Sequence, residues 1–183
     1  MKTLLTISIF ALIFTACKKD KDTEPATPSS VTTVGATYAG GKVFYLDADG
    51  QHGLVVTEND LGEYVWYAGA DFAINTTSYE FGEGLNNTNE IVGAQGSGSY
   101  AAKVCSDLTL NGYSDWYLPS KEELYKVNQL NAANIQGSYW TSTESVYPGQ
   151  TYAWYLQSGT GIPFVQEITG KTSTLKVRAI RNF

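Results

Sequence analysis

The chain has 183 residues and a formal net charge of −6, which is enough length for one ordinary domain with a buried core. From residue 31 onward it carries fifteen acidic and eight basic residues. It therefore lacks the excess of Lys and Arg on which nucleic-acid affinity rests. The composition argues against nucleic acid as a partner and puts polyanionic ligands at a disadvantage.

An export signal is predicted at residues 1–17. Lys2 supplies the positive start, an apolar run follows, and small residues precede Cys17. The run is too short to span a membrane as a helix. Its last four residues, Phe-Thr-Ala-Cys, resemble the lipobox of bacterial lipoproteins, in which the cysteine is acylated. This resemblance implies a lipid anchor on Cys17, and an ordinary cleaved signal is the alternative.

Residues 18–33 are polar, contain Pro and Ser, and offer nothing to bury, which predicts a flexible tether. A single domain is then expected at 34–183. The Lys-Lys-Asp-Lys-Asp run after Cys17 resembles the signals that send lipoproteins of the Bacteroidetes to the outer face of the outer membrane, although a solvated tether explains it equally well. We expect a lipid-anchored outer-membrane protein at the cell surface, with the periplasmic face as the alternative.

The domain opens with a predicted β-hairpin, because two β-rich runs at 40–46 and 54–57 flank a Gly/Asp cluster that includes His52. The sequence Asp47-x-Asp49-Gly50 suggests calcium, but the further oxygen ligands and distal Glu of an EF-hand loop are missing. Asp and Gly are favoured in turns for their local hydrogen bonds and positive φ. A turn therefore explains these Asp and Gly residues better than a calcium site does.

Beyond the hairpin the predicted elements alternate between strands and helices. A strand at 64–67 precedes a long polar region with a short helix near 87–92, and apolar residues at helical spacing predict a helix at 99–108. Ser120 and Glu123 form a capping box that begins a second main helix at 121–130. The remaining predicted strands are 138–143, 152–156, 163–168 and 175–180.

Few residues suit catalysis or metal binding. His52, the one histidine, is expected to be a solvated turn residue, and Cys105 falls on the apolar face of a helix, where a free thiol behaves as a small hydrophobe. One Cys and one His cannot make a structural zinc site. The run 58–60, Glu-Asn-Asp, offers oxygens for calcium, but a turn or helix cap explains the same three residues more simply. We therefore expect no metal, no cofactor and no enzyme activity.

The aromatic residues are the more telling feature, because Tyr and Trp join a rigid apolar body to a polar group and suit sugar binding. Trp116 and Trp154 stand inside apolar runs and are expected in the core. The exposed candidates surround a Pro-Gly turn. Our predicted ligand-binding set consists of Glu144, Tyr147, Gln150 and Tyr152.

Three motifs in order carry a family resemblance: Gly112-Tyr-Ser-Asp-Trp-Tyr-Leu-Pro-Ser-Lys-Glu-Glu-Leu124, Tyr139-Trp-Thr-Ser-Thr143 and Val177-Arg-Ala-Ile-Arg181. With them the chain resembles the DUF1566 family, which includes the C-terminal domain of the Legionella collagen-like adhesin and is similar to the Fibrobacter major paralogous domain. The resemblance implies an α+β, C-type-lectin-like fold in which the first and last strands pair, two helices pack on one side and long loops carry ligands. It also implies that Asp115, Trp116, Arg178 and Arg181 tie helix to sheet.

The sequence thus predicts a non-enzymatic recognition or adhesion lipoprotein that binds glycan or another extracellular polymer. A structural lipoprotein whose partner is an envelope protein is the alternative. A carboxylate-dependent glycan hydrolase is a third possibility, because two acidic residues across a cleft are enough for that chemistry. The sequence does not predict the oligomeric state.

Overall fold

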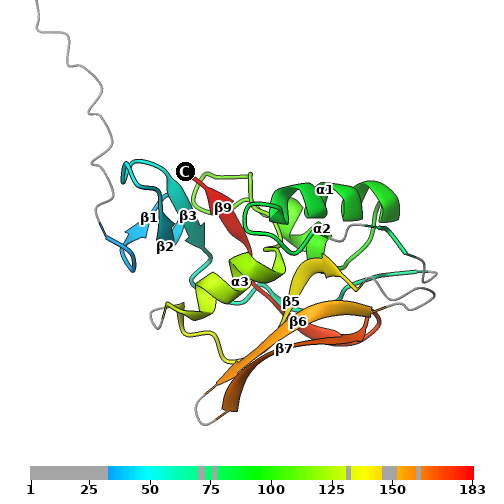
Figure 1. Ribbon diagram of the computed structural model, residues 1–183. Coiled ribbons are helices and arrows are strands. Elements are labelled where there is room, and N and C mark those ends of the chain that lie inside the picture. The colour runs from blue at the N-terminus through cyan, green and yellow to red at the C-terminus, as the bar shows by residue number, and fades with distance from the viewer. Residues whose placement is uncertain (1–32, 70–72, 76–77, 131–132, 146–151, 160–161) are drawn as a thin grey trace, which may run out of the picture.

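The computed structural model describes residues 33–69, 73–75, 78–130, 133–145, 152–159 and 162–183. These residues form two β-sheets and three helices, which confirms the predicted α+β class (Figure 1). The strands are β1 (Thr37–Tyr38), β2 (Gly41–Leu46), β3 (Gly53–Val56), β4 (Gly62–Val65), β5 (Gly137–Glu144), β6 (Tyr152–Gly159), β7 (Ile162–Gly170), β8 (Thr174–Val177) and β9 (Ile180–Asn182). The helices are α1 (Gly84–Gln95), α2 (Ala101–Ser106) and α3 (Lys121–Asn128).

The smaller sheet has the order β1-β2-β3-β9 and is antiparallel throughout. Its centre is the predicted hairpin of β2 and β3. Gly53 opens β3 at a point where only glycine fits: a β-carbon there would lie 2.2 Å from the Tyr45 carbonyl oxygen and 2.8 Å from the Phe183 ring. The last strand therefore packs directly across the hairpin. Its partner is β3, whereas the family resemblance implied pairing with the first strand.

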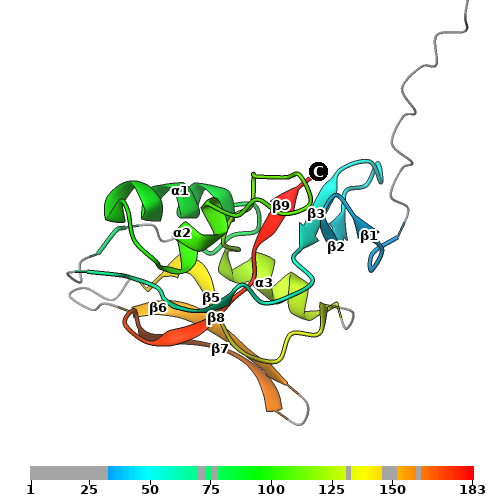
Figure 2. The same ribbon diagram turned by 180° about the vertical axis from the view of Figure 1, so that it is seen from behind.

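The larger sheet has the order β4-β8-β5-β6-β7, with β5 and β8 parallel and the other pairs antiparallel. Figure 2 shows β8 leaving this sheet and β9 entering the smaller one. The prediction of one strand at 175–180 is therefore wrong. The break falls at Arg178, whose guanidinium donates to the carbonyls of Thr57 and Ala133, at 2.8 and 3.1 Å. These bonds hold the chain between the sheets, so it cannot continue in either.

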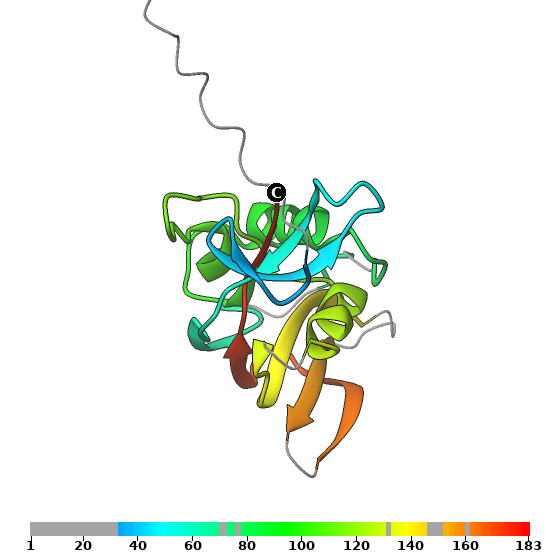
Figure 3. The same cartoon turned by 90° about the vertical axis from the view of Figure 1, so that its left-hand side faces the viewer.

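The helices partly follow the sequence predictions. The predicted helices 99–108 and 121–130 correspond to α2 and α3, and the short helix expected near 87–92 is the middle of the longer α1. The apolar pattern of α1 is weak because two of its buried side chains are polar. Asn87 donates to the Ser78 carbonyl, and the Thr88 hydroxyl accepts from the Leu118 amide. Helix α1 packs against α2, whereas α3 packs against β2 of the smaller sheet and β5 and β6 of the larger one (Figure 3). No helix in the described part of the chain is long and apolar enough to cross a membrane.

The core contains the bulky side chains that the sequence places in apolar runs. Trp66, Trp116 and Trp140 are at most 2 % exposed, and Cys105 is fully buried, as predicted. Trp154 is half-buried, which differs from the prediction. Its ring faces the surface, where the Lys121 ammonium lies 4.4 Å from the ring centre. This cation–π contact stabilises an indole that is only half-buried.

The segment from Asp115 to Glu123 joins helix to sheet. Ser120 Oγ accepts the Glu123 amide and Glu123 Oε2 accepts the Ser120 amide, so the predicted capping box is present. Arg181 donates to both carboxylate oxygens of Asp115, at 2.5 and 2.8 Å, and so fastens β9 to this segment. These contacts agree with the structural role that the resemblance implied for the two residues.

Candidate functional site

The turn end of the β2–β3 hairpin borders a cavity of about 410 Å³, which we call the aromatic pocket. Its walls combine three aromatic rings with polar side chains. They comprise Tyr45, Asp47, His52, Gly53, Leu54, Phe81, Gly82, Asn182 and Phe183. The wall is built from β2, β3, β9 and the loop before α1, so distant parts of the sequence create it together.

The aromatic rings of the pocket are held by contacts with one another and with β1. The ring centres of Tyr45 and Phe81 lie 4.8 Å apart, and those of Tyr38 and Phe183 lie 5.1 Å apart at a steep angle. Such tilted and edge-on pairs are favourable arrangements of aromatic rings. Phe81 remains 40 % exposed. The pocket therefore presents fixed apolar surface to solvent.

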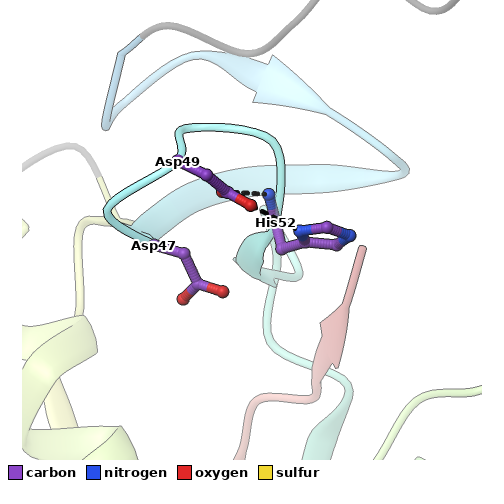
Figure 4. Close-up of side chains that lie close together, drawn as sticks. All are labelled: Asp47, Asp49 and His52. Atoms are coloured by element: carbon purple, nitrogen blue, oxygen red, sulfur yellow. Dashed lines mark hydrogen bonds and ion pairs between the residues drawn. The ribbon is translucent and has the colours of Figure 1, made fainter.

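Polar groups gather in the hairpin turn beside the rings. Figure 4 shows the Asp49 carboxylate bonded to His52. Asp49 accepts the Gln51 amide at 2.8 Å and the His52 Nδ1 group at 3.1 Å, and these hydrogen bonds lower the pKa of Asp49. The turn chemistry expected from the sequence accounts for these contacts. Asp47 lies nearby with an exposed carboxylate.

The same three side chains are the group in the described residues that comes nearest to a metal site. One ligand atom from each of Asp47, Asp49 and His52 lies within 4.8 Å of the others, and all three residues are exposed. Carboxylate and imidazole ligands suit transition metals such as Zn²⁺ and Mn²⁺. However, the bond between Asp49 and His52 already explains why two of them are close.

The ligand-binding set predicted from the sequence is only partly visible. Tyr147 and Gln150 lie outside the described residues. Glu144 is not part of an exposed loop: it ends β5, and its side chain is 2 % exposed. It is ion-paired with the buried Lys171 and accepts the amides of Ile74 and Asn75, at 2.9 and 2.7 Å. Its carboxylate therefore faces inward and supports the fold.

Tyr152, the fourth residue of that set, begins β6 opposite Gly170 and is half-buried. The structure neither joins it to the aromatic pocket nor tests its role in binding. Sequence reasoning missed the pocket because its rings come from three separate segments. Two signals were available: Phe81 stands in an otherwise polar loop, and Phe183 follows the last predicted strand.

A second cavity, also of about 410 Å³, lies at the other end of the hairpin, and we call it the Thr57 cavity. It is lined by Gly40, Thr57, Glu58, Asn59, Asp60, Leu61, Leu108, Leu110 and Asn111. The Asp60 carboxylate forms ion pairs with the Arg178 guanidinium, at 2.5 Å, and with the Lys176 ammonium, at 3.2 Å. Burial raises its pKa, but the hydrogen bond and charge of Arg178 outweigh this and leave the pKa below its usual value. A calcium ion would have to compete with both cations for this carboxylate.

The two residues considered for nucleophilic chemistry lie in different elements. Cys105 is fully buried in α2, and burial strongly raises the pKa of its thiol. Nucleophilic cysteines need the opposite shift, toward the thiolate. His52 lies in the exposed hairpin turn with Asp49 as its partner.

The two sheets, the three helices and the pocket at the hairpin define an α+β domain whose open cavities lie between loops and strand ends. The sequence profile described as the Lcl C-terminal domain matches residues 48–181. The chain therefore belongs to the Lcl C-terminal domain family, also known as DUF1566, and the resemblance stated from the three motifs is confirmed. No curated protein matches the chain.

Proposed function

We propose that the protein is a surface-anchored recognition or adhesion lipoprotein that binds an extracellular glycan in the aromatic pocket. The observation that carries this proposal is the combination of Tyr45, Phe81 and Phe183 with Asp47, His52 and Asn182 around one open cavity. The family adds support: its description is the Lcl C-terminal domain, and the resemblance stated from the sequence links this family to the C-terminal domain of the Legionella collagen-like adhesin.

The chemistry of the pocket suits a sugar. A pyranose ring has an apolar face that stacks on an aromatic side chain and hydroxyl groups that need hydrogen-bond partners. The pocket offers both, since its rings are edged by carboxylate, amide and imidazole groups that donate or accept. Its volume of about 410 Å³ falls in the range of about 300–1,000 Å³ typical of small-ligand sites.

Further aromatic residues beyond the pocket support an extended ligand. Tyr79, two residues before Phe81, is 52 % exposed. Lys121 lies 5.6 Å from the centre of the Tyr79 ring and 4.4 Å from that of Trp154. Tyr125, one helical turn after Lys121, is 37 % exposed. These residues place further accessible aromatic rings at the start of α3, where a longer ligand could make additional contacts.

The finer parts of the proposal concern fold family and location. A C-type-lectin-like fold is supported by the two sheets, the hairpin and the return of the last strand to the sheet of the first. Acylation of Cys17, export and residence in the outer membrane, at the cell surface or on the periplasmic side, are proposed from the sequence at 1–33, of which residues 1–32 lie outside the described residues. Radiolabelled palmitate incorporated by the natural chain but not by Cys17→Ala would support the anchor.

A glycan array probed with residues 31–183 tests the function. We expect binding to a subset of glycans, with affinity about fivefold weaker or more in Phe81→Ala, because one stacked ring contributes about 1 kcal/mol or more. Leu85→Ala is the matched control, because Leu85 is also 40 % exposed and does not line the pocket. No detectable binding to any neutral or acidic glycan would refute the glycan proposal. An equal loss of glycan affinity in Phe81→Ala and Leu85→Ala would refute the assignment of the site to the aromatic pocket.

An envelope-protein partner is the second proposal, and the polar and apolar lining of the Thr57 cavity favours it. After crosslinking in cells, such a partner should copurify reproducibly with the natural chain. Hydrolysis has less support. A general acid needs a raised pKa, whereas the hydrogen bonds from Gln51 and His52 lower that of Asp49 beside the aromatic pocket.

A further inference from the structure

We propose that the Thr57 cavity binds a primary ammonium group carried on an unbranched aliphatic chain, as in the side chain of a lysine. This site is separate from the aromatic pocket, because the two cavities lie at opposite ends of the β2–β3 hairpin and share no lining residue. Three features of the cavity support the inference: an unpartnered buried hydroxyl, an excess of free acceptor atoms, and an apolar wall.

The hydroxyl belongs to Thr57, which is 1 % exposed. Its Oγ1 has no hydrogen-bond partner among the described residues. The Thr57 amide still bonds to the Ala179 carbonyl at 2.9 Å, so the residue continues β3. Side chains two apart in a strand share a face, so Thr57 points to the same side as Val55, which packs in the cluster containing the cavity's leucines. The buried hydroxyl is therefore directed toward the cavity and lacks a donor.

Other acceptors around the cavity are also available. The Thr37 hydroxyl donates to Oε1 of Glu58 at 3.0 Å. The other carboxylate oxygen, Oε2, accepts no hydrogen bond within the described residues. Asn111 uses its Nδ2 group to bond the Gly40 carbonyl, which leaves its Oδ1 atom available. An ammonium group has three donors and no acceptor, so it matches the hydroxyl, the carboxylate and the amide oxygen.

The charges near the cavity disfavour an anion. The cations beside it, Lys176 and Arg178, are both bound to Asp60. Lys42 lies 4.0 Å from Glu58 and donates to the Thr37 hydroxyl at 2.7 Å. Each of these three cations thus already has an acceptor, while Glu58 has capacity left. The cavity can neutralise a further positive charge, but among the described residues it has no free cation for a negative one.

The apolar wall explains why the ammonium should be at the end of an aliphatic chain. Leu61, Leu108 and Leu110 are half-buried and line the same cavity. Lysine side chains bury their methylene groups along apolar surface while the charged end finds polar partners. A bare metal ion or a simple ammonium ion would leave this wall unused.

Thermal-shift and calorimetric titrations of residues 31–183 test the proposal with three probes. N-acetyl-lysine N-methylamide represents a protein side chain, 1,5-diaminopentane a free diamine, and N-acetyl-norleucine N-methylamide the same stem without the charge. We expect saturable binding of the first two below about 10 mM, because millimolar dissociation constants are usual for such small ligands, and none of the norleucine probe. Tighter binding of the lysine probe would indicate a protein partner, and tighter binding of the diamine a free metabolite.

Variants separate binding from folding. Thr57→Val removes the unpartnered hydroxyl at constant shape, so the free protein should keep or raise its melting temperature while affinity for the lysine probe falls about tenfold. Glu58→Gln should weaken the same probe at least tenfold, and Glu90→Gln, an exposed glutamate on α1, should not. Equal binding of lysine and norleucine probes, no saturable binding of either ammonium, or unchanged affinity in both cavity variants would overturn the proposal.

Discussion

Substitution of Glu144 by Gln is expected to destabilise the domain strongly. The carboxylate is 2 % exposed and its partner Lys171 is fully buried. Gln keeps the shape but removes the charge, so the Lys171 ammonium loses the counter-ion that offsets its burial. One of the amides of Ile74 and Asn75 also loses a charged acceptor. Removing one member of a buried ion pair costs about 3–5 kcal/mol.

We therefore expect Glu144→Gln to lower the free energy of unfolding by about 3 kcal/mol at pH 7, which corresponds to a fall in melting temperature of about 6–12 °C for a domain of this size. Urea unfolding of residues 31–183, followed by tryptophan fluorescence, measures the change. Glu90→Gln on the exposed face of α1 is the control and should stay within about 0.5 kcal/mol of the natural chain.

A loss below about 1 kcal/mol, the size typical of an exposed ion pair, would refute the argument that this pair is buried and structural. The double variant Glu144→Gln with Lys171→Met gives the coupling between the two side chains. It should be less destabilised than the sum of the single variants by about 1–3 kcal/mol. Additive losses would show that the two side chains act independently.

Three further predictions concern the cap, the acid response and the thiol. Ser120→Ala should cost about 1–2 kcal/mol in urea unfolding because the capping bond to the Glu123 amide is lost; an unchanged midpoint would contradict the cap. Burial pushes the pKa of Asp60 upward, but the contact with Arg178 leaves it below its ordinary value. The ionised Asp60 therefore stabilises the folded state fully above the unfolded pKa of about 3.9. This stabilisation is lost as the pH falls through the lower folded pKa. Stability should thus fall more steeply below about pH 4 in the natural chain than in Asp60→Asn, and parallel pH profiles would count against this linkage. Cys105 should react with a thiol reagent only as fast as the domain opens, because it is fully buried and burial raises its pKa; rapid labelling of the native protein would show that it is accessible.

Local signals in the sequence were sufficient for most elements of the fold. The Gly/Asp cluster identified the hairpin, and Ser120 with Glu123 identified the start of α3, because both depend on residues close in sequence. The separation of β8 from β9 was not predictable in this way. It depends on Arg178 reaching the carbonyls of Thr57 and Ala133, which are distant in sequence.

The candidate site was much less predictable than the fold. A Tyr-rich turn after Glu144 is typical of a binding loop, but no local pattern shows that the Glu144 carboxylate faces the buried Lys171. The aromatic pocket depends on Gly53 allowing Phe183 to lie against the hairpin. That approach is a property of the tertiary structure, so only isolated aromatic residues could be recognised from the sequence.

The return of β9 to the smaller sheet has a mechanical consequence. Of the residues that line the aromatic pocket, those in strands belong to β2, β3 and β9, in the sheet that also contains β1, the strand nearest the proposed tether. If the chain is held at its N-terminal side and a ligand pulls on these strand residues, the force passes to the anchored end through this sheet. The five-stranded sheet and the large tryptophans Trp66 and Trp140 are outside that path. A bound cell or polymer would then strain the hairpin region first, while the larger sheet stays folded.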